Sequence, residues 1–305
     1  MSQLGEPKTA VRPSGILLVD KPAGPTSHDA VAAVRRALGT RRVGHFGTLD
    51  PFATGLLVCG IGPATRLAPF CTSHDKTYAA TFRLGQTSTT DDPEGEIVPQ
   101  PIAPIPDRET IERACEAWTG EVEQTPPAYS AKHVGGERAH ALARRGEAVA
   151  LAPVAVEIRS IAVERYRYPD LDVLIECGPG TYVRALARDL GEALGTGAYC
   201  LTLRRLRLGP FTVDRALSLD ALSEASARLL PAADAVRDLP RVELGEAAAR
   251  AVSNGQVARP GGLPAPGWVA LFGPRGFIGL GEVVEEGDGG IVRPRRILYP
   301  DGEGQ

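Results

Sequence analysis

The sequence predicts an α+β protein with one large mixed domain and a small β-rich domain after it. At 305 residues the chain is longer than one average domain. Strand-like and helix-like apolar patterns follow one another with no regular β-α-β alternation, which favours α+β over a parallel α/β sheet. From residue 241 onward, glycines and short apolar runs such as "WVALFG" dominate. We therefore expect a first domain over 12–240 and a second over 241–305, joined near Pro240.

Three elements are expected in the first ninety residues. "GILLVDKPAG" (15–24) has the apolar run of a short buried strand followed by a turn. "TSHDAVAAVRRALG" (26–39) carries an apolar stripe at helical spacing, with Ser27 as a plausible N-cap and Gly39 as its end. "KTYAATFRLG" (76–85) alternates with period two, which predicts a strand. The residues that share its apolar face are Tyr78, Ala80, Phe82 and Leu84.

The middle of the chain alternates between loops and regular elements. Residues 91–106 are acidic and then proline-rich, so we expect a loop, and 107–120 follow as a helix. "QTPPAYSAKHVGGERAHALARRGEAV" (124–149) mixes proline, glycine and basic residues with little apolar periodicity, which indicates a mobile excursion. Two strands with turns are expected over 152–180, and a helix over 181–195.

Composition excludes several classes of protein. The apolar fraction of 43% and the charged fraction of 23% are ordinary for a globular protein, and a net charge of −3 gives no indication of nucleic acid by itself. The five cysteines are widely spaced and contain no C-x-x-C pair, which argues against a disulfide framework and a zinc site. No apolar run has the length of a signal core or a membrane span. A cytoplasmic location with no membrane partner is expected.

His45 and Asp50 stand in an apolar stretch, "VGHFGTLDPFATGLL" (43–57). Asp50 has an ordinary interpretation as a turn aspartate or helix cap, and His45 as a buried histidine satisfied by backbone. The chain has no H-x-x-x-H, no G-x-S-x-G and no glycine-rich phosphate loop, so a metal site, a serine hydrolase and a nucleotide cofactor have no support.

Six segments occur together and in order: "LLVDKPAGPTSHDAV", "GHFGTLDPFATGLL", "DKTYAATFRLG", "QTPPAYSAKHVGG", "CGPGTYVRALARDLG" and "LRRLRLGPF". The series closely resembles the TruB family, the bacterial tRNA pseudouridine-55 synthases, from about residue 14 to 215. The resemblance implies a pseudouridine synthase catalytic domain with a mixed or antiparallel sheet core. The later segments "LSLDAL", "SNGQVARP" and "FIGLGEVVEEGDGGIVRPRRIL" look like the PUA-type RNA-binding domain that often follows it.

The resemblance also implies residue roles. Asp50 falls on the catalytic nucleophile, and Arg184 in "GTYVRAL" on the arginine that pairs with it. Tyr78 matches the aromatic that stacks on the target base. The further matches, in the pocket or beside the flipped nucleotide, are His45, Tyr182, Leu203 and, within an acidic loop, Asp92.

Pseudouridine formation consumes no metal, redox equivalent or cofactor, and none is expected here. A carboxylate at the glycosidic bond has to be ionised in a dry pocket. Burial raises a carboxyl pKa, so an opposing guanidinium such as Arg184 is needed to keep Asp50 charged. The apolar wall desolvates Asp50, and Gly47 and Gly55 are expected to let backbone approach the RNA closely.

RNA binding requires basic surface despite the acidic total. Acid-free stretches that outline a phosphate track contain Arg35, Arg36, Arg41 and Arg42, then Arg204, Arg205 and Arg207, with more bases in 124–149 and at Arg293, Arg295 and Arg296. In the family, the counterpart of 124–149 is a flexible thumb that orders on the RNA. The partner implied is the T-arm of tRNA, bound by a monomer.

Three alternatives stay open beside this enzyme. One is an RNA-binding or tRNA-folding protein whose catalysis is dispensable. Another is a guide-RNA-dependent relative of the dyskerin type, against which the long 124–149 segment argues. A metal- or serine-dependent hydrolase has almost no sequence support.

Overall fold

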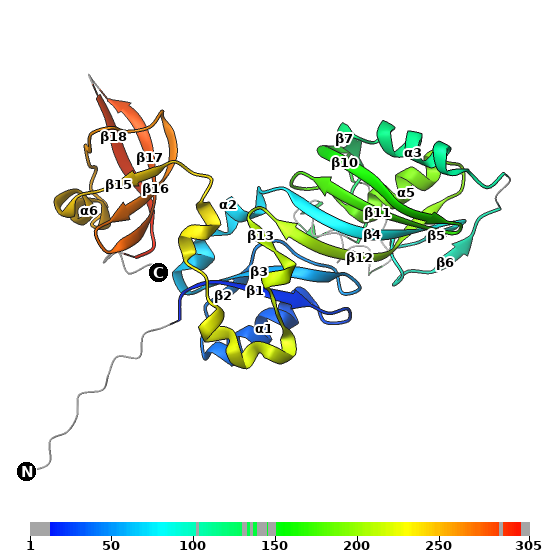
Figure 1. Cartoon of the computed structure of the whole chain (residues 1–305), viewed down its shortest axis with the longest axis horizontal. Helices are drawn as coiled ribbons and strands as arrows, with labels where there is room; N and C mark the ends of the chain where they lie inside the picture. The colour runs from blue at the N-terminus through cyan, green and yellow to red at the C-terminus, as the bar shows by residue number, and fades with distance from the viewer. Residues whose placement is uncertain are drawn as a thin grey trace, which may run out of the picture.

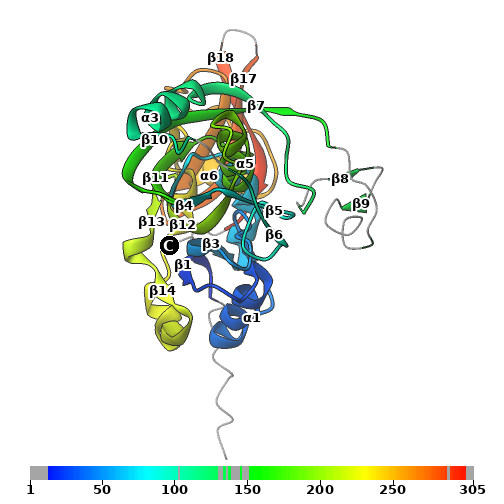
Figure 2. The same ribbon diagram turned by 90° about the vertical axis from the view of Figure 1, so that its right-hand side faces the viewer.

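The computed structural model describes residues 13–101, 104–129, 133–134, 137–138, 145, 151–286 and 289–299. Most of the predicted mobile segment 124–149 therefore lies outside the described residues. Two short strands within it, β8 (His133–Val134) and β9 (Glu137–Arg138), pair with each other. Figure 2 shows this pair standing away from the main sheet.

A mixed sheet forms the centre of the first domain. Its path runs β14-β1-β3-β12-β4-β11-β10-β7, with β2 added to β3 and β13 to β12. β1 pairs in parallel with β14 and β3 with β12, and the other pairs are antiparallel. The strands are β1 (Gly15–Lys21), β2 (Val43–His45), β3 (Thr54–Ile61), β4 (Lys76–Leu84), β7 (Gly120–Gln124), β10 (Val154–Arg167), β11 (Asp170–Cys177), β12 (Ala198–Leu208), β13 (Phe211–Thr212) and β14 (Leu217–Ser218). The α+β prediction with a mixed sheet is confirmed.

Helices cover the two ends of this sheet (Figure 1). α1 (Ser27–Leu38) and the 3₁₀ helix η3 (Leu219–Arg228) pack together beside β1, while α5 (Val183–Ala193) packs on β12 and α3 (Arg108–Ala117) on β10. Helices α1, α3 and α5 coincide with predicted ones, whereas α6 (Glu246–Ser253) in the second domain was not predicted. Their apolar stripes decide the orientation, because Val34 of α1, Ile111 of α3 and Leu186 of α5 are completely buried.

The apolar face predicted for residues 76–85 is confirmed. Tyr78, Ala80, Phe82 and Leu84 of β4 are all buried in the main core. The alternation places Arg83 and Thr81 on the opposite face, where Arg83 pairs with Asp170 of β11.

Several local predictions were wrong or incomplete. The N-cap of α1 is Thr26, whose hydroxyl accepts from the Asp29 amide while Asp29 accepts from the Thr26 amide, and Ser27 is the first helical residue. The expected loop 91–106 contains β6 (Ile97–Pro99), which pairs with β5 (Gln86–Ser88). Strand β12 was not predicted, because its arginines hide the alternation. Short helices α2 (Ala68–Thr72), η1 (Gly62–Leu67), η2 (Val213–Arg215) and η4 (Ala232–Val236) were also missed.

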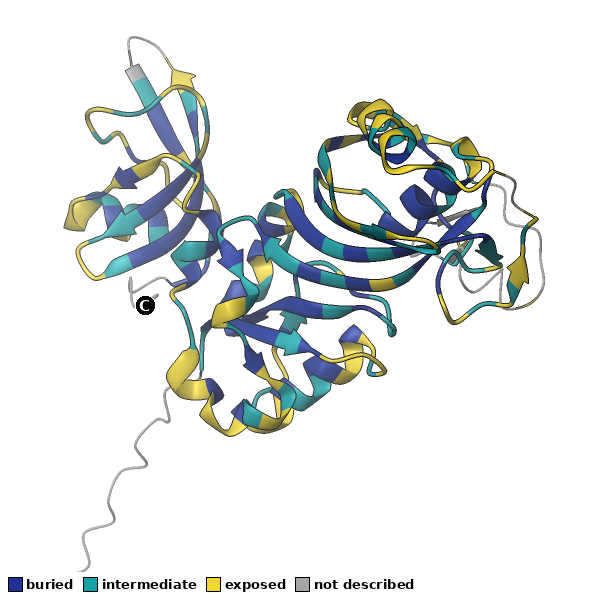
Figure 3. Ribbon diagram, turned by 45° about the vertical axis from the view of Figure 1, so that its right-hand side comes forward, coloured by how far each residue is buried: buried dark blue, intermediate teal, exposed yellow. Residues whose placement is uncertain are grey.

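A separate four-stranded sheet, in the order β15-β16-β17-β18, follows the first domain. Its elements are β15 (Arg241–Glu243), α6 (Glu246–Ser253), β16 (Gly267–Gly273), β17 (Gly276–Glu286) and β18 (Gly289–Ile297). One buried cluster joins the two sheets, since Ile16 and Phe46 share it with Phe277 and Leu280. Figure 3 shows buried segments in both sheets. Arg66 donates to the Ile297 carbonyl at 2.6 Å, and Arg296 to the Arg66 carbonyl at 2.8 Å. The second sheet is therefore held against the first by a shared apolar core and by hydrogen bonds from arginine side chains to backbone carbonyls. Among the helices in the described ranges, none is both long and apolar enough to cross a membrane.

Candidate active site

The loop that carries Asp50 joins β2 to β3 and is held by buried polar side chains. The Ser27 hydroxyl donates to the Leu49 carbonyl at 2.9 Å and accepts from the Leu49 amide at 2.8 Å. Lys21, at the end of β1, is completely buried and donates to the Pro51 carbonyl at 3.1 Å and to the Pro22 and Pro25 carbonyls at 2.8 Å. Backbone on both sides of Asp50 is therefore fixed from α1 and β1.

Arg205 of β12 holds the same loop from a third direction. Its guanidinium donates to the Gly47 carbonyl at 3.0 Å, to Thr48 at 3.4 Å and to Leu56 at 2.7 Å. The side chain is 1% exposed. It lies where β3 and β12 meet in parallel, a register that contains the pairs Thr54–Arg204 and Gly55–Arg205. Arg205 thus ties the centre of the sheet to the Asp50 loop.

Two sequence predictions about this region were wrong for one residue each, Arg205 in the phosphate track and Gly55 in the approach to RNA. Arg205 is buried and cannot face a phosphate. Arg204 makes two hydrogen bonds to the Asp20 carboxylate and Arg207 pairs with Glu176, and the side chains of these two arginines are 40% and 34% exposed. Gly55, at φ +96°, is required by strand packing, since a Cβ there would collide with the Arg205 carbonyl.

Removing the Ser27 hydroxyl should loosen this loop. Ser27→Ala leaves the buried Leu49 amide and carbonyl without their partner, so we expect the free energy of unfolding to fall by about 1–3 kcal/mol. Urea denaturation checks it, with Ser73→Ala as a matched control because the Ser73 hydroxyl is exposed and also donates to a backbone carbonyl. Equal stability of the two variants would contradict the assignment.

Arg184 stands on the first turn of α5 and bridges two carboxylates. Its Nε lies 2.9 Å from Asp50 Oδ2, and its Nη1 lies 2.9 Å from Asp92 Oδ2. The remaining donors reach backbone, with Nη1 to the Thr90 carbonyl at 2.9 Å and Nη2 to the Tyr129 carbonyl at 3.0 Å. The structure therefore brings Asp50 and Arg184 together, and it adds Asp92 as a second carboxylate that pairs with the same guanidinium.

The surroundings raise the pKa of the Asp50 carboxyl above the usual value of an aspartate. Burial is the largest influence and raises the pKa of its carboxyl, the charge of Asp92 raises it further, and Arg184 and Lys21 offset only part of this. The Asp92 carboxylate also accepts from the Thr90 hydroxyl at 2.5 Å and from the Glu94 amide at 3.0 Å. Of the Asp50 side-chain surface, 36% is exposed, which leaves an approach for a substrate.

Tyr78 and Leu203 lie on neighbouring strands in the apolar wall near Asp50. Tyr78, 7% exposed, is paired with Arg205 across β4 and β12, and Leu203 with Ala80. Burial raises the pKa of the Tyr78 phenol, and the nearby Arg205 guanidinium lowers it to a smaller degree. Tyr78 is thus a neutral phenol whose ring is almost enclosed before any RNA binds.

Gln124 is a site-building residue that the sequence did not indicate. Its amide is completely buried, accepts from the Tyr182 amide at 2.8 Å and donates to the Tyr182 carbonyl at 3.1 Å. Tyr182 is the N-cap of α5 and has no side-chain cap bond. Gln124 therefore fixes the start of the helix whose first turn carries Arg184. No local pattern could identify it, because its partner is 58 residues away.

His45 ends β2, ahead of the Asp50 loop. Its ring centroid lies 5.7 Å from that of His28 in an edge-on arrangement. Its Nδ1 is buried without a hydrogen-bond partner among the described residues. Burial, then the charges of His28 and Arg205, lower the pKa of His45, so its imidazole is neutral at neutral pH.

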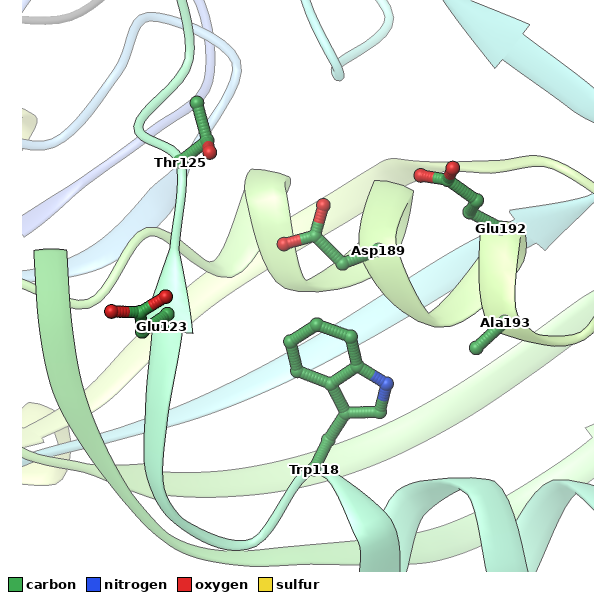
Figure 4. A pocket seen from close by; sticks show the side chains of 6 residues that line it. All are labelled: Trp118, Glu123, Thr125, Asp189, Glu192 and Ala193. Atoms are coloured by element: carbon green, nitrogen blue, oxygen red, sulfur yellow. The ribbon is translucent and has the colours of Figure 1, made fainter. Parts of the chain in front are cut away.

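Two further features bear on what the site binds. In the part of the chain that the structure describes, no three His, Cys, Asp or Glu side chains are grouped as metal ligands. A pocket of about 330 Å³ lies beside α5, and Figure 4 shows Asp189 over the Trp118 ring, with Glu123 to one side and Glu192 to the other. Its lining carries three carboxylates, of which Asp189 pairs with Arg188.

Comparisons with known proteins place this geometry in context. A family model described as the TruB family pseudouridylate synthase N-terminal domain matches residues 35–183. Models of the tRNA pseudouridylate synthase B C-terminal domain and of the Pseudouridine synthase II TruB C-terminal domain match 184–245 and 240–298. The chain is 44% identical over 304 residues to the tRNA pseudouridine synthase B of Arthrobacter sp. (strain FB24), covering 95% of this chain and 98% of that one. It is 46% identical over 275 residues to the protein of that name from Thermobifida fusca (strain YX), covering 87% and 92%.

Solved structures share the fold. A Cbf5-Nop10-Gar1 complex contains a chain that matches with a TM-score of 0.73 at 25% identity, over 95% of this chain and 87% of that one. A chain in an H/ACA RNP bound to a substrate RNA containing 2′-deoxyuridine matches with the same TM-score at 24% identity, over 94% and 85%.

Proposed function

This chain belongs to the TruB family of pseudouridylate synthases, and from that premise we propose that it isomerises uridine 55 in the T-loop of tRNA with Asp50 as nucleophile. The coarser statement, that it is a tRNA pseudouridine synthase, follows from relatives of that name that align over nearly their whole length. Uridine 55 as the target is inferred from the resemblance to the family. The role of Asp50 is inferred from that resemblance and from its pairing with Arg184.

One observation carries the mechanism. Asp50 is a carboxylate with an open approach, on a loop fixed from three elements, and it faces a buried arginine. In the reaction the C1′–N1 bond of uridine breaks, the base turns, and C1′ bonds to C5; C5 loses a proton and N1 gains one. A fixed carboxylate attacks the sugar or the base, or stabilises the cation formed, and it keeps its geometry without reorganisation. Arg184 favours the ionised form that the attack needs.

The uridine has to leave its stack to reach Asp50. Unstacking costs roughly a few kcal/mol, and stacking on an aromatic recovers about 1–3 kcal/mol per base. We assign Tyr78, Tyr182, Leu203 and His45 to the pocket of the flipped nucleotide, by their resemblance to family positions. The neutral imidazole of His45 suits a site from which water and charge are excluded.

We further infer that the RNA follows basic groups near the end of α1. Arg36, Arg41 and Arg42 are exposed there, directly before β2 and the Asp50 loop. Residues 124–149 would serve as a thumb, and 241–305 as a PUA-like RNA-binding domain. The enzyme would act as a cytoplasmic monomer on the T-arm without a guide RNA.

Purified protein and an unmodified tRNA transcript test this proposal. Pseudouridine is mapped by carbodiimide adduct and primer extension, with and without EDTA. We expect modification of the single T-loop uridine, with no added RNA and no effect of chelator. A protein that binds the transcript and leaves every uridine unchanged would be an RNA-binding protein, and one that acts only after a second RNA is added would be guide-dependent.

Activity should be lost on the acidic side at a higher pH than an exposed aspartate would give. The reaction needs ionised Asp50, so kcat/KM falls as pH falls through the pKa of the folded enzyme, which burial raises. Asp92→Asn removes a charge that raises this pKa, so the acidic limb should move to lower pH. Rates from about pH 4 to 8, with circular dichroism at each pH, check both statements. A limb that stays in place in Asp92→Asn would refute the coupling.

A further inference from the structure

Helix α5 presents two arginines one turn apart, and the mechanism above uses only the first. Each of the three guanidinium nitrogens of Arg188 makes a short polar contact. Its Nη1 lies 2.8 Å from Asp91 Oδ2, its Nη2 donates to the Thr125 carbonyl at 2.8 Å, and its Nε donates to Asp189 Oδ1 at 2.8 Å. Residues at this spacing lie on the same face of a helix, so Arg184 and Arg188 face the same neighbouring segments.

Both arginines form hydrogen bonds to the same two segments of the chain. The first is the turn 90–92, where Arg184 contacts the Thr90 carbonyl and the Asp92 carboxylate, and Arg188 the Asp91 carboxylate. The second is the segment 125–129, where Arg188 takes the Thr125 carbonyl at one end and Arg184 the Tyr129 carbonyl at the other. The position of Arg184 therefore depends on segments that Arg188 also holds.

The backbone conformation of the turn 90–92 depends on contacts from outside the turn. Asp91 has φ +60°, and it is the one non-glycine residue with positive φ among the residues that the structure describes. L-residues rarely adopt this conformation, and aspartate tolerates it best when its side chain is satisfied. The Asp91 carbonyl accepts from the Cys200 amide at 3.0 Å, and its side chain, 13% exposed, has Arg188 as its ion pair.

Arg188 also affects Arg184 through charge, because both guanidinium groups act on the Asp91 carboxylate. Asp91 is nearly buried, and both Arg188 and Arg184 lower the pKa of its carboxyl, which burial raises. Without Arg188, the guanidinium of Arg184 would face the carboxylates of Asp50, Asp91 and Asp92 alone, and Asp91 would draw it away from Asp50.

We propose that Arg188 is a positioning residue for the isomerisation, which acts through the turn 90–92 and the segment 125–129 to hold Arg184 against Asp50. The inference rests on the proposed function, in which the Asp50 carboxylate performs the chemistry. Arg188 contacts Asp91, Asp189 and the Thr125 carbonyl, and not Asp50 itself.

The test compares single-turnover rates at saturating enzyme with tRNA dissociation constants. Arg188→Ala should lower the rate of pseudouridine formation by about 10- to 100-fold, because small displacements in a catalytic constellation have effects of that size. The tRNA dissociation constant should stay close to that of the parent. Arg188→Lys should recover part of the rate, since an ammonium can pair with Asp91 but cannot serve three acceptors in a planar fork.

Arg83→Ala is the matched control. Arg83 is 29% exposed, as Arg188 is, and it also pairs with a carboxylate, Asp170, but it lies on the face of β4 opposite Tyr78. A loss of stability alone would appear in both variants, whereas a loss of rate at saturation should appear only in Arg188→Ala.

Asp91→Asn supplies the second arm, because asparagine keeps the left-handed turn and removes the charge. It should lower the rate, and combined with Arg188→Ala it should add little further loss, since the two residues act as one unit. If Arg188→Ala does not fold, Arg188→Lys and Asp91→Asn decide the question. Rates equal to that of Arg83→Ala, a change confined to the dissociation constant, or fully additive losses would overturn the proposal.

Asp50→Asn in the same assay separates the two levels of inference. If it is inactive while the Arg188 variants behave as the control does, only the positioning role fails. If it remains active, the proposed nucleophile fails, and the positioning role fails with it.

Discussion

Asp50→Asn is expected to lower the single-turnover rate of pseudouridine formation by about 10⁴-fold or more, the scale on which loss of a nucleophile acts in other enzymes. The amide matches the carboxylate in shape but has no negative charge and is a poor nucleophile. The rate is measured with saturating enzyme on the tRNA transcript.

Stability and binding should survive this change. Burial raises the pKa of folded Asp50, so the folded state loses stability relative to the unfolded one as pH rises above the unfolded pKa, and this cost reaches its full size above the folded pKa. A neutral amide removes the cost, so the urea midpoint at neutral pH should not fall below that of the parent. Asp170→Asn, which neutralises the partner of Arg83, is the matched control and should keep its activity. A parent-like rate in Asp50→Asn would remove this residue from the nucleophile role.

Arg184→Met is expected to damage both activity and stability. It removes the counter-charge of Asp50 and leaves Asp92, which is 2% exposed, as an unpaired buried carboxylate. Breaking a buried ion pair from one side costs about 3–5 kcal/mol of unfolding free energy. The rate should fall by about 10²-fold or more, because a preorganised charge at the reacting group is lost.

A double variant separates the two effects of Arg184. Adding Asp92→Asn to Arg184→Met removes the unpaired carboxylate, so urea denaturation should show most of the lost stability restored. The rate should stay low, because Asp50 still lacks its guanidinium. Recovery of the rate together with stability would mean that Arg184 serves the fold alone.

The helices and strands that the sequence predicted correctly are those with a clear apolar periodicity along the chain. Periodicity indicated α1, α3, α5 and β4 because helices and strands bury faces defined by neighbours two to four residues apart. It failed for β12, where Arg204, Arg205 and Arg207 interrupt the apolar alternation, and for the short strands β5 and β6, which stand on either side of an acidic segment. A buried arginine has the same letter as an exposed one, so no pattern revealed that Arg205 lies in the core.

The sequence by itself determined the fold class, the family and the identity of Asp50 and Arg184 as a candidate pair, since these depend on periodicity and on ordered motifs. Only the tertiary structure decided what surrounds them. It assigned Ser27, Lys21, Gln124 and Arg205 to holding the backbone of the site, it divided Arg184 between Asp50 and Asp92, and it raised the pKa of Asp50. The reason is physical: these partners lie 22 to 158 residues apart along the chain, and burial and electrostatic energy depend on distance in space.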